Sequence, residues 1–258
     1  MVRSGDLGIS VVEGGVAGGV PVVLVHGYPD TSEVWAGVAE RLGRRFRVVR
    51  YDVRGAGRSG EPGGVEGYRV ERLVEDLVAV VGEVGQPVHL VGHDWGSVQG
   101  WAAVVARPEL FRSFTSVSGP DLGQLGDWVR RNRLRPVKVA GVLGRSWYIA
   151  GFMVPGVAEV LWRVPVVRKW LRAGRRELVN GLGLYRANVG RGRVPAVVSV
   201  PVHQIELTED PFVVREHLEA AEPWVERLTR SSVHAGHWAP RTHPEQVARH
   251  IEDAIADR

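Results

Sequence analysis

Short apolar runs recur along this chain, and segments with helical spacing separate them. Residues 20–26 (VPVVLVH) form a run that is rich in β-branched residues and ends at glycine, which is typical of a strand buried on both faces. Leu73, Leu77 and Val80 recur at intervals of three and four, which predicts a helix over residues 70–82. The same criteria predict strands at 46–51, 87–91, 114–118, within 197–207 and at 229–234, and helices at 97–106 and 244–256.

The alternation of strands and helices predicts an α/β fold with a doubly wound, mostly parallel sheet. Residues 122–194 break this alternation, because they contain no clear buried strand. We therefore expect an α/β core formed by residues 1–121 and 195–258, with a helical lid (a cap) inserted at 122–194. Open α/β folds bind ligands at the carboxyl edge of the sheet, so the lid is expected to cover that edge.

Composition narrows the functional classes. The chain has 258 residues, of which 44% are hydrophobic, and this suits a single domain with an insertion. It contains no cysteine, which excludes disulfide scaffolds, cysteine-based zinc sites, iron–sulfur clusters and thiol catalysis. No apolar run reaches the roughly 18 residues of a membrane span, and the N-terminus does not resemble a signal peptide. We expect a cytoplasmic protein with no transmembrane segment.

Charge is distributed unevenly along the chain. The formal net charge is +4, but residues 121–195 carry 15 basic and 4 acidic side chains, a net charge of +11. An acidic substrate, an acidic partner or a membrane surface would be attracted to such a lid, although a solvated positive face without a partner has the same pattern. No nucleic-acid-binding module accompanies the charge, and we expect no nucleic-acid partner.

The segment GHDWGS (residues 92–97) carries the strongest chemical signal. It joins a predicted buried strand to a predicted helix, as in the nucleophile elbow, where glycines permit a tight turn that holds one side chain over the sheet. The residue at that point is Asp94. Ser97 lies inside the helix, which disfavours a serine esterase. The alternative reading of Asp94 is an ordinary helix-capping residue.

A nucleophile of this kind needs an acid and a histidine, which follow it in chain order. Glu206, Glu209 and Asp210 lie at the end of a predicted strand, and His237 lies in a glycine-flanked loop after the last strand. His237 could also be a surface residue. A metal site built on His237 and its neighbouring histidines is disfavoured, because no carboxylate stands at metal-ligand spacing in a helix. We expect neither a metal nor an organic cofactor.

Several motifs together resemble the α/β-hydrolase fold family and, within it, the epoxide hydrolases, in particular the hydrolase part of actinobacterial members. They are HGYP (26–29), YDVRGAGRS (51–59), GHDWGS (92–97), EDPFV (209–213) and AGHW (235–238). Two lid segments resemble the same group, SWYIAGFMVPGVAE (146–159) and LYRAN (184–188). The first contains Tyr148 and the second Tyr185.

The resemblance implies a catalytic triad and a role for each matching residue. Asp94 would attack an epoxide and form a covalent ester intermediate, Tyr148 and Tyr185 would protonate the opening ring, and His237 would activate water to release a vicinal diol. Asp210 matches the family's acid position, with Glu206 as a weaker candidate. Backbone N–H groups of Trp95 and Tyr28 would form the oxyanion hole, and His26, Phe152, Met153 and Trp238 would line the substrate pocket.

Other readings of the same residues remain open. Haloalkane dehalogenases share several of these motifs and the Asp nucleophile, and a non-catalytic ligand-binding protein can be built on the same fold. The two tyrosines could be amphipathic lid residues with hydroxyls at the water interface. The sequence also departs from the family pattern, since Met153 stands where a glutamine is common and Tyr28 where a phenylalanine is common. The expected partners are a small epoxide and water, in detoxification or secondary metabolism.

Overall fold

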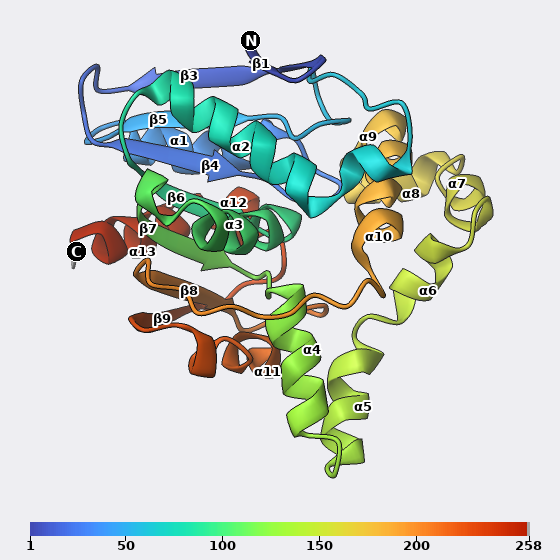
Figure 1. Cartoon of the computed structure of the whole chain (residues 1–258). Coiled ribbons are helices and arrows are strands. Elements are labelled where there is room, and N and C mark those ends of the chain that lie inside the picture. Colours follow the sequence, from blue (N-terminus) through green and yellow to red (C-terminus); the bar gives the residue numbers. More distant parts are fainter. Residues whose placement is uncertain (257–258) are drawn as a thin grey trace.

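A computed structural model of the chain describes residues 1–256 (Figure 1). Its centre is a seven-stranded sheet with the strand order β3-β5-β4-β6-β7-β8-β9, in which β3 is antiparallel to β5 and the other neighbours are parallel. The strands of the large sheet are β3 (Val11–Gly15), β4 (Pro21–Val25), β5 (Arg47–Tyr51), β6 (Val88–His93), β7 (Phe111–Val117), β8 (Val202–Leu207) and β9 (Leu228–Val233). A separate antiparallel pair is formed by β1 (Val2–Ser4) and β2 (Leu7–Ile9).

The predicted fold class is therefore confirmed, and the six predicted strands correspond to β4–β9. Strands β1–β3 were not predicted. Two of them have only three residues, and β3 reads VVEGG, with its last three residues exposed. Strand β3 owes its extended form to its pairing with β5, a contact between distant residues that no local pattern announces.

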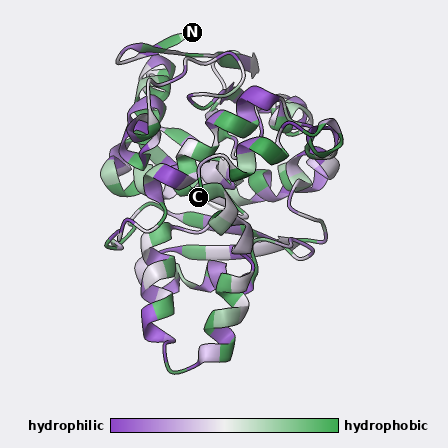
Figure 2. Cartoon of the chain, turned by 90° about the vertical axis from the view of Figure 1, so that its right-hand side faces the viewer, coloured by the Kyte–Doolittle hydropathy of each residue, from purple (hydrophilic) through white to green (hydrophobic). Residues whose placement is uncertain are grey.

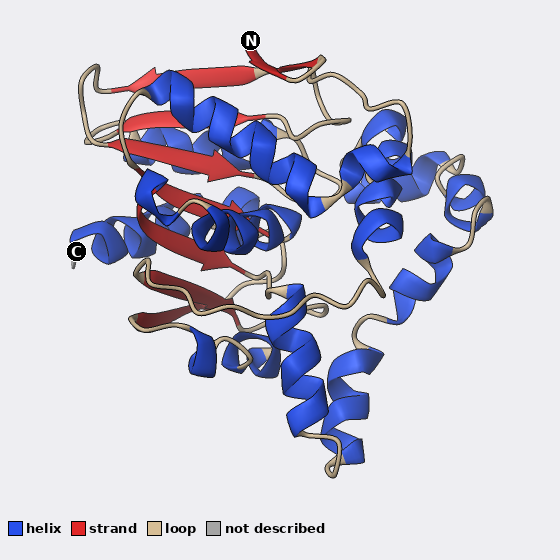
Figure 3. Ribbon diagram, in the orientation of Figure 1, coloured by secondary structure: helices blue, strands red, loops and turns tan. Residues whose placement is uncertain are grey.

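Helices cover both faces of the sheet (Figure 3). One face packs against α2 (Val70–Val84) and α3 (Trp95–Ala106), and the other against α1 (Ala36–Leu42) and α13 (Pro244–Ala256). The remaining core elements are α11 (Arg215–Glu219), α12 (Ala239–Thr242) and the 3-10 turns η1 (Ser32–Trp35), η2 (Val65–Tyr68), η3 (Pro108–Leu110) and η4 (Glu222–Trp224). Strands enclosed on both faces in this way need apolar side chains in both directions, which explains why β4 is buried at every position.

Seven consecutive helices lie beyond the carboxyl ends of the strands, on the right in Figure 1. They are α4 (Leu122–Arg131), α5 (Pro136–Gly144), α6 (Trp147–Met153), α7 (Val157–Leu161), α8 (Pro165–Leu171), α9 (Arg175–Asn180) and α10 (Leu182–Asn188). They occupy the segment for which a helical lid was expected, and we refer to them as the lid.

Hydrogen bonds from α9 fix one side of the lid to the loop that follows β5. Arg176 donates to the carbonyl oxygens of Gly57 and Ser59, at 2.6 and 2.8 Å, and Asn180 Nδ2 donates to Gly55 O at 3.0 Å. Because side-chain donors on the lid satisfy backbone carbonyls on the core, the seating of α9 depends on this loop keeping its shape.

The loop itself is held by a buried ion pair. The Arg54 guanidinium donates to both carboxylate oxygens of Asp76 on α2 at 2.7 Å, and both side chains are almost inaccessible to solvent. Arg54 also donates to the backbone carbonyls of Gly67 and Arg72, so its donors are well satisfied.

We predict that Asp76→Ala lowers the free energy of unfolding by about 3–5 kcal/mol, because it leaves the Arg54 charge buried without a counterion. Urea denaturation followed by circular dichroism measures this loss. Glu75→Ala is the matched control, because the neighbouring Glu75 pairs with Arg72 at the surface. A loss for Asp76→Ala no larger than that for Glu75→Ala would contradict the prediction.

Candidate active site

Asp94 stands at the sharp turn between β6 and α3. Its φ and ψ angles are 53° and −120°, an uncommon conformation for a residue other than glycine. The turn is tight, because a Cβ atom added at Gly96 would overlap the carbonyl oxygen of Val25. The Asp94 side chain makes no capping hydrogen bond to α3, so the helix-cap alternative is wrong.

Two backbone N–H groups point at the Asp94 carboxylate. The Tyr28 N–H donates to Oδ1 at 2.7 Å, and the Trp95 N–H also hydrogen-bonds to the carboxylate. Tyr28 lies in the loop after β4, which approaches Asp94 so closely that a Cβ at Gly27 would overlap its side chain. The two groups expected to form an oxyanion hole therefore both contact the Asp94 carboxylate.

His237 lies between two carboxylates. Its Nδ1 contacts Asp210 Oδ2 at 2.7 Å, and its Nε2 lies 3.7 Å from Asp94 Oδ2. Asp210 also accepts hydrogen bonds from the Ser118 hydroxyl and, at 2.7 Å, from the Phe212 N–H. The parallel sheet produces this arrangement, because β6, β8 and β9 deliver the three side chains to the same edge.

The other acids considered for this role point elsewhere. Glu206 lies 3.7 Å from the Arg215 guanidinium, and Glu209 lies 3.3 Å from the exposed His234. Of the three carboxylates, Asp210 is the one that contacts the His237 ring.

The electrostatics of the three groups are coupled. Burial alone would lower the pKa of His237, but the hydrogen bond to Asp210 and the charges of Asp210, Asp94 and Asp30 raise this pKa above its ordinary value. Burial raises the pKa of Asp94, opposed by His237 and the two N–H donors. Burial works in the same direction on Asp210, but its hydrogen bonds prevail and lower its pKa. Asp210 is thus the more firmly ionised of the two acids.

Tyr148 of α6 and Tyr185 of α10 line one cavity of about 580 Å³ together with Asp94 and His237. The two rings meet edge to face with centroids 6.3 Å apart. Burial and the Asp94 charge raise the pKa of both phenols far above 10. Both hydroxyls therefore remain protonated donors at neutral pH.

Most of the cavity wall is apolar. Phe152 and Trp238 line it as expected, together with Trp147, Gly151, Val157, Ala158, Leu161, Trp162, Val167, Leu171 and Phe212. Apart from Asp94 and His237, the residues that line it carry no ionisable group other than the phenols. A ligand of this cavity is therefore expected to be predominantly apolar.

Two residues expected in the pocket lie outside it. Met153 is 37% exposed on the lid surface and does not line the cavity. His26 is buried beneath the loop, where its Nδ1 donates to Gly27 O and its Nε2 accepts from the Val53 N–H, both at 2.9 Å. Both of its nitrogens are thus used to shape the turn, and the placement of these two residues in the pocket is corrected.

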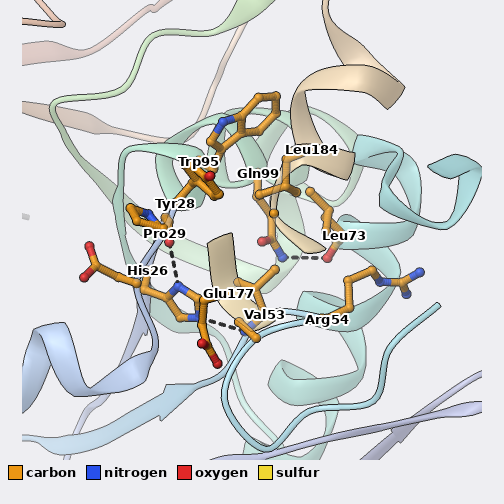
Figure 4. Close-up of a pocket in the computed structure, with 15 residues that line it drawn as sticks. His26, Tyr28, Pro29, Val53, Arg54, Leu73, Trp95, Gln99, Glu177 and Leu184 are labelled. Carbon is orange, nitrogen blue, oxygen red and sulfur yellow. Dashed lines mark hydrogen bonds between the residues drawn. The ribbon is translucent and has the colours of Figure 1, made fainter. Parts of the chain in front are cut away.

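His26 instead borders a second, much smaller cavity on the far side of the Tyr28 loop (Figure 4). Its accessible volume of about 20 Å³ is comparable to one water molecule. Gln99 also lines it, with Nε2 donating to Leu73 O at 2.6 Å and a buried Oε1 that has no partner within residues 1–256. A cavity of this size with an unpartnered amide oxygen in its wall suits a structural water better than an organic ligand.

Sequence analysis missed several residues that hold the site together. Asp30 pairs with Arg241 and accepts a hydrogen bond from the Trp238 indole at 3.1 Å, which ties the Tyr28 loop to the His237 loop. Burial raises the pKa of Asp30 to about 6. His93 Nε2 donates to the His237 carbonyl at 2.8 Å. In the sequence, these two residues could have been found by their position, because Asp30 directly follows HGYP and His93 directly precedes Asp94.

Tyr28 also has an unanticipated contact with the lid. Its hydroxyl donates to Leu178 O of α9 at 2.9 Å, and its ring meets that of Tyr185 edge to face at 5.4 Å. The hydroxyl that distinguishes Tyr28 from the commoner phenylalanine thus joins the loop bearing an Asp94 donor to the lid.

Within residues 1–256, no three His, Cys, Asp or Glu side chains are grouped so that they could hold a metal ion. None of the helices in that range has the length and apolar character required to cross a lipid bilayer.

Comparison of the sequence with known proteins matches an α/β-hydrolase fold family and two named mycobacterial relatives. A family model described as alpha/beta hydrolase fold matches residues 20–142. A Mycobacterium tuberculosis protein named probable oxidoreductase EphD is 36% identical over 95% of this chain and 47% of its own length. Epoxide hydrolase A of the same species is 31% identical over 62% of this chain and 48% of its own length. The chain thus spans about half the length of these relatives.

Solved structures share the complete fold. A Bacillus megaterium epoxide hydrolase in complex with an inhibitor is similar with a TM-score of 0.83 at 22% identity, over 99% of both chains. A Vigna radiata epoxide hydrolase is similar with a TM-score of 0.75 at 23% identity, over 97% of this chain and 94% of its own. At these identities the similarity establishes the fold alone.

We predict that Asp94→Asn lowers the pKa of His237, because it removes one of the charges that raise it. Histidine ring signals followed by NMR across a pH titration measure the shift. The control is Glu209→Gln, which removes a carboxylate at the same edge of the sheet. Because Glu209 pairs with His234, this change should leave the His237 pKa unchanged. An unchanged His237 pKa in Asp94→Asn would show that Asp94 does not act on the ring.

Proposed function

The chain belongs to the α/β-hydrolase fold family, and we propose that within it the chain is an epoxide hydrolase that forms a covalent ester on Asp94. The observation that carries the proposal is the composition of the cavity wall. A carboxylate, a histidine and two protonated phenols face one apolar space. Ring opening of an epoxide needs these groups together, namely a nucleophile, an acid for the leaving oxygen and a base for the second step.

In the proposed first step an Asp94 carboxylate oxygen attacks one epoxide carbon. The carbon–oxygen bond of the ring breaks, and the departing oxygen takes a proton from Tyr148 or Tyr185. The Tyr185 side chain lies beside Tyr148 and lowers its pKa, opposing the effect of burial, so it helps Tyr148 to give up its proton. The product is a β-hydroxyalkyl ester of Asp94.

In the second step His237 removes a proton from water, and the resulting hydroxide attacks the ester carbonyl carbon. Negative charge then develops on the carboxyl oxygen that faces the N–H groups of Tyr28 and Trp95. Each such donor is typically worth about 3–4 kcal/mol to the transition state. The ester bond breaks, the departing oxygen takes the proton from His237, and the remaining proton of the water restores the tyrosine. The sum is epoxide plus water giving a vicinal diol.

The charge coupling leaves His237 neutral, and so able to act as a base, at the second step. While Asp94 is ionised, its charge favours the protonated form of His237. Ester formation neutralises Asp94, so the His237 pKa falls and the ring is ready to accept a proton from water. Asp210, firmly ionised by its own hydrogen bonds, then stabilises the imidazolium.

A haloalkane dehalogenase is the second candidate, because it would use the same Asp94. A departing halide is usually held by indole N–H donors. Here the indole of Trp95 packs edge to face against the Tyr185 ring at 5.0 Å, and Tyr28 stands in the position of the second donor. The protonated phenols favour an epoxide, whose oxygen needs an acid.

We predict that His237→Gln accumulates a covalent adduct, because the ester still forms but its hydrolysis lacks a base. Intact mass spectrometry after incubation with a panel of small apolar epoxides should show a gain equal to the whole epoxide, since the ring oxygen stays in the adduct. The matched control is His234→Gln, on an exposed histidine three residues earlier, which should turn over without an adduct.

Two outcomes would contradict the proposal. A gain equal to a haloalkane minus hydrogen halide, with no epoxide adduct, would indicate a dehalogenase. No adduct from either class, with no turnover by the wild type, would remove the support for covalent catalysis at Asp94.

We predict further that Tyr148→Phe and Tyr185→Phe each slow ester formation on the order of 10²-fold and that the double variant is slower still, because the departing oxygen loses its acid. Rapid mixing of epoxide with each variant in the His237→Gln background measures the rate of adduct formation directly. Tyr68→Phe is the control, since Tyr68 is buried outside the larger cavity. Unchanged adduct rates in the double variant would exclude the tyrosines as acids.

A further inference from the structure

The outer surface of helices α6–α8 exposes a group of large apolar side chains. Val160 and Val166 are 60% and 69% exposed, and Trp147 is 78% exposed. We call this group the lid patch; its members are Trp147, Val154, Val157, Val160, Leu161, Val164 and Val166. Soluble domains seldom leave so many apolar side chains exposed within 20 consecutive residues unless they contact something else.

Basic side chains accompany this apolar group in the sequence. Residues 147–176 contain six basic side chains and one carboxylate, Glu159, which is paired with Arg186 at 2.7 Å. Arg163, Arg168, Lys169 and Arg172 have no ion-pair partner in the part of the chain that the structure describes, and all stand within or directly after the patch. Figure 2 views this side of the molecule and shows hydrophobic and hydrophilic residues interspersed on it.

The patch is continuous with the cavity. Trp147, Val157 and Leu161 are exposed to solvent on the lid surface, and the same three residues line the cavity that contains Asp94. The cavity is partly open, so its apolar wall passes into the exposed patch without an intervening polar rim at these residues. An apolar molecule resting against the patch would already touch the wall of the cavity.

We propose that the lid patch docks onto an anionic lipid bilayer. Exposed valine, leucine and tryptophan side chains enter the boundary between headgroups and acyl chains, and the arginines and lysine of the same segment contact the anionic headgroups. Such an arrangement holds the protein at the surface by a sum of weak contacts and needs no membrane-spanning helix. The bilayer fits both the apolar lid patch and the unpaired cations of the same segment, and thereby accounts for their presence together.

Docking in this way points the cavity mouth at the bilayer. Apolar epoxides partition into membranes, so a site that opens onto the bilayer receives its substrate from the phase where that substrate is concentrated. This second part rests on the proposed function, whereas the docking itself does not.

The test is flotation of the full chain with vesicles made of equal parts phosphatidylcholine and phosphatidylglycerol, compared with vesicles of phosphatidylcholine alone. The wild type should float with the anionic vesicles, less so as salt increases, and not with the neutral ones. Val160→Ser/Val166→Ser tests the apolar contribution, and Arg163→Gln/Lys169→Gln tests the charge. Each double variant should lower the partition coefficient on the order of tenfold.

The matched controls replace the same kinds of side chain, two valines and two basic residues, at exposed positions outside the lid. The control variants should bind vesicles as the wild type does, because they change exposed residues of the α/β domain rather than of the lid. They are Val65→Ser/Val105→Ser and Arg44→Gln/Arg249→Gln. None of the four substituted lid residues lines the cavity, so the lid variants should keep wild-type turnover of a water-soluble epoxide. That activity also shows that they are folded.

Absence of flotation by the wild type, or equal flotation of lid and control variants, would overturn the docking proposal. Lid-dependent dimerisation in sedimentation experiments without vesicle binding would overturn it in favour of a second copy of the chain. The flotation experiment tests docking alone, because it does not depend on turnover. A missing adduct in His237→Gln would instead count against the proposed function alone.

Discussion

The backbone turn at Asp94 sets the distances on which the whole site depends. With φ at 53°, the residue directs its carboxylate toward the loop after β4, where the Tyr28 N–H donates to it at 2.7 Å. Backbone conformations of this kind cost on the order of 1–3 kcal/mol. The close packing of Gly96 against β4 and the parallel pairing of β6 with its neighbours offset that cost. A larger residue at Gly96 would displace the carboxylate.

Around that turn, three carboxylates act electrostatically on a single histidine, His237. Asp210, Asp94 and Asp30 all raise the His237 pKa, but each is controlled in a different way. Asp210 is ionised through its hydrogen bonds, Asp30 is paired with Arg241, and Asp94 is the one that lines the cavity. A reaction at Asp94 therefore changes the charge around His237, while the other two acids keep their partners.

Sequence patterns predicted the parts of the structure that depend on local composition. The apolar runs gave β4–β9, and the final helix was expected over the residues that α13 occupies. Strands β1–β3 were missed because they are short or polar and depend on pairing with distant residues.

At the candidate site, too, local motifs were predictive and contacts between distant residues were not. Asp94, His237 and Asp210 were identified from motifs, and the structure brings them within contact of one another. The contact of Ser118 with Asp210 and that of Tyr28 with Leu178 join residues 92 and 150 positions apart, so no local pattern announces them. Met153 was misplaced because the register of a short lid helix decides which side chains face inward, and a motif does not fix that register.

The cavity wall has a chemical consequence that follows from the position of Met153. Because Met153 lies outside and the chain has no cysteine, no sulfur atom lines the cavity. Peroxides and related oxidants convert thiolates to sulfenic acids and thioethers to polar sulfoxides, which damages sites that contain them. A centre built from carboxylates, imidazole, phenols and hydrocarbon lacks those targets. The cavity can therefore meet such oxidants without losing a side chain to sulfur oxidation.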